Sequence, residues 1–221
     1  MIQLHYYPGN ASLIAHILLE EIGLPYQRVL VDRSRAAHKA PAYLKLNPNG
    51  LIPVLTDDAA DGLVLYETAA ICLHLCDTHT QAGLAPAFAT PQRAHFYKWL
   101  AWLTNTLQSS LITYFYPERW VNEGNAAGAA EVRAQAQARI GAMLEQIDAE
   151  LARVADAGPW FMGARISALD PYVFTLCRWT RGFSDKPARD YGHIGPYLQR
   201  MLQRPAVQRV LGVEQLAQPW V

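Results

Sequence analysis

The chain has 221 residues, of which 51% are hydrophobic and 17% charged, and this length suits two small domains with packed cores. Its 19 Lys and Arg residues balance 19 Asp and Glu residues, which argues against a protein that binds nucleic acids or anionic membranes through net positive charge. No apolar run reaches the length of a membrane-spanning helix.

The three cysteines, Cys72, Cys76 and Cys177, all lie in apolar runs of helical pattern. An odd number of buried thiols indicates a reducing compartment without a disulfide framework, so we expect a cytoplasmic protein. Cys72 and Cys76 are one helical turn apart, but two thiols alone do not make a metal site, and we expect none.

The first thirty residues have the pattern of a strand, a helix and a second strand. Residues 2–6 alternate apolar and polar side chains, as a half-buried strand does. A loop at residues 7–11 leads to a helix that starts near Ser12 and ends at Gly23. Residues 26–31 then predict a strand, and a βαβ unit of this size has parallel strands joined by a right-handed crossover.

A polar, weakly helical connector at residues 33–46 precedes a second group of elements. Prolines and glycines punctuate the loop at residues 47–53. Two short apolar runs, at 54–55 and 63–66, are separated by turn residues, which predicts a β-hairpin. The apolar run at residues 69–76 then predicts a buried helix.

Glu67 and Thr68 stand between the second hairpin strand and this helix. Thr68 suits the N-cap position, and a helix N-terminus presents free N–H groups that can hold a carboxylate. Glu67 beside it can pair with an ammonium group. The two residues therefore predict either an ordinary helix cap with an exposed acid or a site for the α-amino-acid end of a ligand.

Beyond a linker with proline and glycine at residues 79–91, every predicted element is a helix. Apolar residues recur every three or four positions over 96–111 and again over 140–154, which marks two long amphipathic helices. Ser167 and Asp170 then form a variant of the capping box, in which each side chain accepts the backbone N–H of the other. The helix that they start is apolar nearly all round, so we expect it to be buried and the two residues to act in folding.

The loop Leu51-Ile52-Pro53, the pair Glu67-Thr68 and the box at Ser167 and Asp170 together resemble the glutathione S-transferase superfamily over nearly the whole chain. The resemblance implies an α/β domain followed by an all-α domain. The expected segments are a thioredoxin-like βαβ-α-ββα domain at 1–78 that binds glutathione, a linker at 79–91, and an all-helical domain at 92–221 that supplies the electrophile pocket. A homodimeric detoxification enzyme, which conjugates glutathione to apolar electrophiles, is also implied.

The same resemblance assigns glutathione-binding residues. In the family, the proline is cis and the residue before it pairs its backbone with the cysteinyl unit of glutathione, which gives these roles to Pro53 and Ile52, with Leu51 beside them. The pair Glu67-Thr68 is expected to meet the γ-glutamyl ammonium and the α-carboxylate. Arg35 stands where the bacterial Beta class has a lysine that holds the glycine end.

The loop from Tyr6 to Leu13 most resembles the Beta class, but Ala11 stands where that class has the cysteine that forms a mixed disulfide with glutathione. A thiol with a pKa of about 8.5 is only a few per cent thiolate near neutrality, so some group must stabilise the sulfur. The candidates are the Ser12 hydroxyl, which is equally well explained as a plain N-cap, the Asn10 amide and, in reserve, the Tyr6 hydroxyl.

Aromatic side chains are expected to wall the pocket for an apolar electrophile, namely Tyr7, Tyr114, Phe115 and Trp120. Absence of the family cysteine weakens covalent redox chemistry but leaves conjugation open. Three alternatives remain: glutathione-dependent reduction of peroxides or disulfides, ligand binding without turnover, and an interaction module that shares only the fold.

Overall fold

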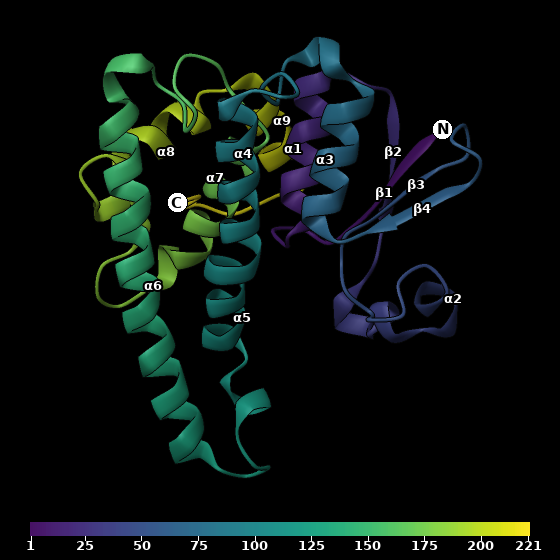
Figure 1. The fold of residues 1–221 in the computed structure, drawn as a ribbon. Coiled ribbons are helices and arrows are strands. Elements are labelled where there is room, and N and C mark those ends of the chain that lie inside the picture. Colours follow the sequence, from purple (N-terminus) through teal and green to yellow (C-terminus); the bar gives the residue numbers. More distant parts are fainter. The chain divides into compact units, whose positions relative to one another are not determined.

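The computed structural model describes residues 1–221 and contains two compact units (Figure 1). The first unit comprises Met1–Ala85 together with Leu202–Gln218, and the second comprises Pro86–Met201 together with Pro219–Val221. The helical domain was expected to extend to residue 221, whereas in the structure Leu202–Gln218 belongs to the first unit.

A four-stranded sheet with strand order β2-β1-β3-β4 lies in the first unit. Strand β1 (Ile2–Tyr6) pairs in parallel with β2 (Tyr26–Leu30) and antiparallel with β3 (Val54–Asp57), which pairs antiparallel with β4 (Leu63–Tyr66). Helix α1 (Ser12–Ile22) connects the parallel pair. The predicted βαβ unit and the predicted hairpin are both confirmed.

Helices α1 and α3 (Thr68–Thr78) lie side by side against this sheet (Figure 1). The first eight residues of α1 are all buried, as their apolar composition requires. The connector that was predicted to be weakly helical forms two 3-10 turns and one short helix, which are Arg33–Arg35, Ala37–Lys39 and α2 (Pro41–Leu44). A further 3-10 turn, Thr80–Ala82, follows α3.

Helix α9 (Pro205–Val213) packs against α1 and explains why the C-terminal segment belongs to the first unit. Arg204 donates from Nε and Nη2 to the two carboxylate oxygens of Glu21 at 2.5 and 2.6 Å. Arg209 Nε donates to Glu20 Oε2 at 2.7 Å. A helical tail carries no local sign of the unit against which it packs, so its sequence pattern could not reveal this assignment.

The second unit is entirely helical. Helix α4 (Pro91–Trp102), a π-helical segment (Leu103–Gln108) and α5 (Ser109–Phe115) form one continuous run, and α6 (Ala126–Val154) lies beside α5 (Figure 1). The apolar positions predicted for the two long helices are buried. Local apolar spacing does not reveal the π segment that interrupts the first of them. The 3-10 turns of this unit are Pro117–Trp120, Ala155–Ala157, Thr180–Gly182 and Ala188–Asp190.

Helix α7 (Leu169–Trp179) is buried from its first residue to Arg178, as predicted. The apolar residues of α8 (Ile194–Leu202) recur at helical spacing, but a glycine and a proline interrupt the pattern in its first turn, and no helix was predicted here. The backbone N–H groups at the start of α8 donate to an acid of helix α6. Asp148 Oδ1 accepts the backbone N–H groups of His193 at 2.7 Å and of Ile194 at 2.9 Å.

The predicted capping box at the start of α7 is half right. Asp170 Oδ2 accepts the Ser167 N–H at 2.7 Å, as expected. Ser167 Oγ accepts from the N–H of Leu169 at 3.3 Å, whereas the Asp170 N–H donates to the Ser167 carbonyl at 3.0 Å. Because the Asp170 N–H bonds to the backbone carbonyl of Ser167, the Ser167 hydroxyl accepts instead from the N–H of Leu169, one residue before the expected donor.

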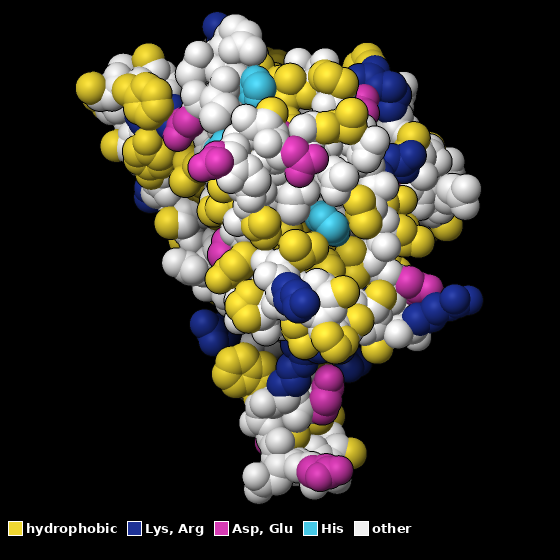
Figure 2. All heavy atoms as spheres, turned by 90° about the vertical axis from the view of Figure 1, so that its right-hand side faces the viewer, with side chains coloured by type: hydrophobic (Ala, Val, Ile, Leu, Met, Phe, Trp, Pro, Cys, Tyr) yellow, Lys and Arg dark blue, Asp and Glu magenta, His cyan; other side chains and the backbone are white.

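All three cysteines are free and buried. Burial raises the pKa values of the Cys72 and Cys177 thiols, so these two side chains stay protonated near neutrality and are poor nucleophiles. No helix is both long and apolar enough to cross a bilayer. On the face shown in Figure 2, basic and acidic side chains are interspersed rather than segregated.

Candidate active site

The strand register brings three of the predicted segments to one edge of the sheet. His5, next to the end of β1, pairs with Val54, the first residue of β3, and Val54 also pairs with Tyr66, the last residue of β4. Antiparallel neighbours place the end of one strand beside the start of the next. The loop after β1, the Ile52-Pro53 peptide and Glu67 therefore lie at the same edge.

The peptide bond between Ile52 and Pro53 is cis, as the family resemblance implied. The backbone N–H and C=O of Ile52 have no hydrogen-bond partner within the chain. The carbonyl of Leu51 is held instead, because it accepts from the Tyr43 hydroxyl at 2.7 Å and from the buried amide of Asn47 at 2.9 Å. The loop is thus fixed on one side of Ile52 while the backbone of Ile52 itself stays available.

Gly50 is required for this loop to approach its neighbour. Its φ is 60°, and a Cβ at this position would lie 2.8 Å from the carbonyl oxygen of His38. Glycine alone adopts this conformation without strain and leaves room for that contact. Asn47 is a site-supporting residue that sequence pattern did not single out, since an asparagine before a proline is also ordinary turn chemistry.

Glu67 adopts φ 71° and ψ 113°, a conformation that costs a non-glycine residue energy and is often found at functional sites. Its carboxylate makes no hydrogen bond or ion pair within the chain. Thr68 is the first residue of α3, and Glu67 occupies the N-cap position without a side-chain cap bond. The prediction of Thr68 as N-cap is wrong because the turn at Glu67 starts the helix one residue early.

The loop after β1 contains a type II turn. The Asn10 N–H donates to the Tyr7 carbonyl at 3.1 Å, with Pro8 and Gly9 between them, and Gly9 has a φ of 68° at the position where this turn needs a positive value. Asn10 Oδ1 accepts from the N–H of Ala11 at 2.6 Å. The Asn10 amide nitrogen keeps both of its protons without a partner in the chain.

Ser12 is the first residue of α1 rather than its N-cap, and no side chain caps this helix either. Its hydroxyl donates to the Tyr7 carbonyl at 3.1 Å and accepts from the Tyr7 N–H at 3.3 Å. The residue has no exposed surface. The proton that was expected to reach a bound thiol is therefore used to close the loop.

Tyr6 and Arg35 are less constrained. The Tyr6 ring lies edge-on to His16, with centroids 6.0 Å apart, and the Arg28 guanidinium lies 5.7 Å from its centre. Arg35 ends a 3-10 turn, its side chain is 87% exposed, and its Nε lies 3.6 Å from Asp32. An exposed pair of this kind contributes little to stability, so the Arg35 side chain can leave Asp32 at small cost.

The predicted electrophile residues are divided between the units. Tyr7 belongs to the first unit and packs against a buried cluster that includes Ile52 and Val54. In the second unit, Tyr114 contacts Phe115 with centroids 5.2 Å apart. Trp120 is 64% exposed and makes no ring contact with this pair. A common pocket that includes all four residues stays a prediction.

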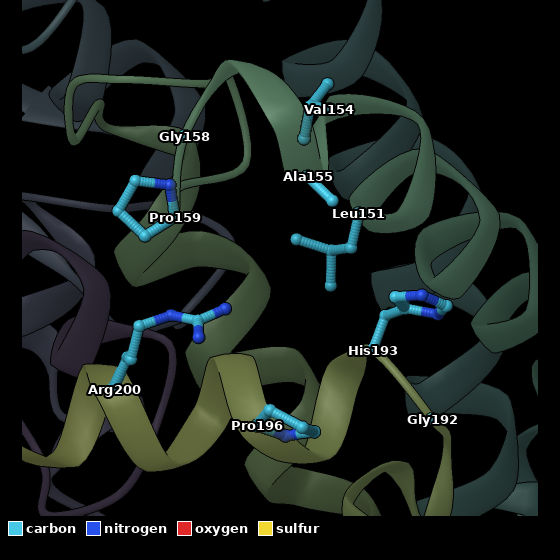
Figure 3. A pocket seen from close by; sticks show the side chains of 9 residues that line it. All are labelled: Leu151, Val154, Ala155, Gly158, Pro159, Gly192, His193, Pro196 and Arg200. Carbon is cyan, nitrogen blue, oxygen red and sulfur yellow. The ribbon is translucent and has the colours of Figure 1, made fainter.

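The helical unit contains a cavity of about 450 Å³ that shares no residue with the predicted site. Figure 3 shows His193 and Arg200 on the α8 side of this cavity, with Leu151 of α6 across from them. Its lining therefore supplies none of the groups assigned to glutathione.

Two buried residues connect the loop after β1 to the C-terminal helix. Glu214 Oε2 accepts the Gly9 N–H at 2.8 Å, and Glu214 Oε1 lies 2.6 Å from Nδ1 of His16. The side chains of both members of this hydrogen-bonded pair are at most 1% exposed. The pair joins residues 198 positions apart, which is why no sequence motif reveals it.

The comparisons with known proteins agree with this geometry. The family model described as the N-terminal domain of glutathione S-transferase matches residues 11–78. The glutathione S-transferase GstA of Escherichia coli O157:H7 is 30% identical over 215 residues, which cover 97% of this chain and 99% of the relative.

Two solved structures extend the likeness to the fold. A glutathione transferase homologue from Sulfitobacter with bound glutathione has a TM-score of 0.86 and 29% identity, covering 98% of this chain and 99% of its own. A bacterial Beta class enzyme from Sphingomonas chungbukensis has a TM-score of 0.79 and 28% identity, covering 97% of this chain and 100% of its own. With a relative at 30% identity over nearly the whole length of both proteins, the chain belongs to the glutathione S-transferase family.

Proposed function

We propose that this protein binds glutathione at the edge of its sheet and activates the thiol for attack on apolar electrophiles. One observation carries the proposal. The free backbone groups of Ile52, the unpaired carboxylate of Glu67 and the uncapped N-terminus of α3 lie at the same edge. They complement, in turn, the peptide backbone, the ammonium and the carboxylate of a γ-glutamyl-cysteinyl ligand.

Each part of glutathione has a partner in this proposal. The Ile52 N–H and C=O pair with the cysteinyl unit as a neighbouring strand does. The Glu67 carboxylate accepts from the ammonium, and charge-assisted hydrogen bonds of this kind are the strong ones. The first N–H groups of α3, with the Thr68 hydroxyl, hold the α-carboxylate. Arg35 takes the glycine carboxylate.

The geometry changes the order of the three candidates for the thiolate donor. Lowering a thiol pKa by two units takes about 2.7 kcal/mol of preferential stabilisation of the thiolate. We assign that task to the amide of Asn10 and to the Ser12 N–H at the positive end of α1, because the Ser12 hydroxyl already donates to Tyr7 and the N–H groups of Leu13 and Ile14 donate to backbone carbonyls. Ser12 then shapes the loop, and Tyr6 stays in reserve.

The reaction itself needs few groups. The bound thiol loses its proton to solvent, and the sulfur lone pair forms a bond to the electrophilic carbon. With a chloroarene, chloride leaves with the electron pair of the broken carbon–chlorine bond. Aromatic side chains such as Tyr114 and Phe115 suit an apolar acceptor, and buried free cysteines suit the reducing cytoplasm.

Retention on immobilised glutathione, followed by conjugation of chlorodinitrobenzene, tests this function. We expect both retention and turnover. Retention without conjugation would favour a binding protein of the same fold, and turnover of peroxides or disulfides alone would favour the reductase alternative. Failure to bind glutathione would contradict the proposed site as a whole.

The donor assignment is tested by titrating the thiol of bound glutathione through the ultraviolet absorbance of its thiolate. Asn10→Ala is expected to raise the pKa of the bound thiol by about one unit, the effect of losing one hydrogen bond to an anion. Ser12→Ala is expected to lower stability by about 1 kcal/mol with a smaller change in that pKa. A shift confined to Tyr6→Phe would give the role to the tyrosine instead.

We also expect a homodimer, on the strength of the family resemblance. Sedimentation at micromolar protein concentration should then give about twice the 24.7 kDa of one chain. A mass of one chain under those conditions would contradict this expectation.

A further inference from the structure

Glu214 directly follows the last residue of α9 and connects two parts of the candidate glutathione site. One carboxylate oxygen accepts the N–H of Gly9 in the loop after β1, and the other pairs with His16 in α1. The Glu214 N–H itself donates to the Val210 carbonyl at 2.9 Å. The carboxylate that follows α9 therefore bonds both to the loop after β1 and to α1, the helix that follows this loop.

We propose that Glu214 is a positioning residue of the glutathione site, which holds the loop after β1 in the conformation that directs its donors at the thiol. This inference rests on the proposed function. It adds a residue, distant in sequence, on which activation of the thiol depends, and it assigns α9 a part in that activation.

The burial of the pair supports a rigid connection. The side chains of His16 and Glu214 are 1% and 0% exposed, so water does not compete for their hydrogen bonds. His16 is held on two further sides, because its ring packs edge-on against Tyr6 and Tyr26 with centroids 6.0 and 5.7 Å away. A carboxylate fixed in this way constrains Gly9 relative to α1.

The loop geometry shows what depends on this constraint. Gly9 is the left-handed residue of the type II turn, and Asn10 follows it directly. A rotation of the peptide at Gly9 would redirect the Asn10 amide and the Ser12 N–H at the start of α1. The Gly9 bond to Glu214 is formed across 205 residues, whereas the bond from the Asn10 N–H to the Tyr7 carbonyl that closes the turn joins residues within the loop. Glu214 is therefore suited to select this turn conformation.

The position of α9 is set independently of this contact. The ion pairs of Arg204 with Glu21 and of Arg209 with Glu20 also join α9 to α1. They supply a matched control, because their loss weakens the same helix packing without touching the loop. Arg204→Gln is the control variant.

The test measures glutathione affinity and the pKa of the bound thiol in the full-length protein. Glu214→Ala should raise the pKa of the bound thiol by about one unit, while the dissociation constant for glutathione changes less than about threefold, because the groups at Ile52 and Glu67 are untouched. Arg204→Gln should leave both quantities unchanged. Glu214→Gln keeps an oxygen for the Gly9 N–H and should restore most of the wild-type pKa.

Removing one member of a buried pair can prevent folding, so a second variant keeps the inference testable. The double substitution His16→Phe with Glu214→Leu replaces both members by apolar groups and keeps an aromatic ring beside Tyr6 and Tyr26. It should raise the thiol pKa as Glu214→Ala does. If the folded variants keep the wild-type thiol pKa, Glu214 has no positioning role. If the wild-type protein itself neither binds glutathione nor lowers the thiol pKa, the proposed function fails and this inference with it.

Discussion

Replacing Asp170 with alanine is expected to lower the free energy of unfolding by about 3–5 kcal/mol. The carboxylate has no exposed surface, and it accepts from the N–H of Phe161 at 2.8 Å, the N–H of Ser167 at 2.7 Å and the hydroxyl of Tyr197 at 3.0 Å. Each buried donor that loses its acceptor costs about 1–3 kcal/mol. Urea denaturation followed by circular dichroism measures the loss.

The pH dependence of this loss follows from the environment of Asp170. Burial raises the pKa of this carboxyl above its ordinary value, although its hydrogen bonds oppose the shift. The folded state therefore binds the proton more tightly than the unfolded state does. The stability that protonation contributes is complete below the ordinary pKa of 3.8 and is lost as the pH rises through the folded value. The difference in free energy of unfolding between wild type and Asp170→Ala should therefore decrease as the pH rises from 3.8 through the folded pKa of Asp170.

Ser167→Ala is the matched control for this prediction. It removes one cap acceptor of the Leu169 N–H and one donor to Asp170, and the loss of a helix cap typically costs about 1 kcal/mol. Neither variant should change the glutathione affinity of the folded fraction, since the groups proposed to bind glutathione lie in the first unit. An Asp170→Ala protein as stable as Ser167→Ala would show that the buried hydrogen bonds contribute little.

Apolar patterns and turn residues were sufficient to predict the strands, α1 and α3 of the first unit and the buried faces of the long helices. It was not sufficient for the helix starts, where two predicted caps were wrong. Ser12 and Thr68 both have cap-forming side chains, but the hydroxyl of Ser12 bonds to Tyr7 and the turn at Glu67 begins α3 one residue early. Which of two adjacent residues becomes the cap depends on backbone dihedrals that the preceding strand sets.

Long-range pairs account for most of what sequence reasoning missed. Helix α9 buries apolar residues in the first unit and forms ion pairs with α1, and the loop after β1 bonds to Glu214. An acid at the end of a helix is ordinary surface chemistry until its partner is known. The assigned glutathione-binding residues, by contrast, could be proposed from local motifs because each one lies at a strand or helix end.

Glu67→Ala is expected to weaken glutathione binding by tens-fold or more. A hydrogen bond to a charged group contributes about 1.5–3 kcal/mol, and the unpaired carboxylate of Glu67 is the acid assigned to the ligand ammonium. Alanine keeps the strained backbone at φ 71°, so the substitution relieves no strain and should leave stability nearly unchanged. Isothermal titration calorimetry measures the affinity, and Arg35→Ala, with a side chain 87% exposed, should cost less.

A modified ligand separates this contact from any indirect effect of the substitution. Glutathione acetylated at its amino group lacks the ammonium, so wild-type protein should bind it as weakly as Glu67→Ala binds glutathione. The variant, having no acid to lose, should bind the two ligands with nearly equal affinity. If Glu67→Ala still prefers glutathione over the acetylated form by the wild-type ratio, another group holds the ammonium and Glu67 acts only through the turn that begins α3.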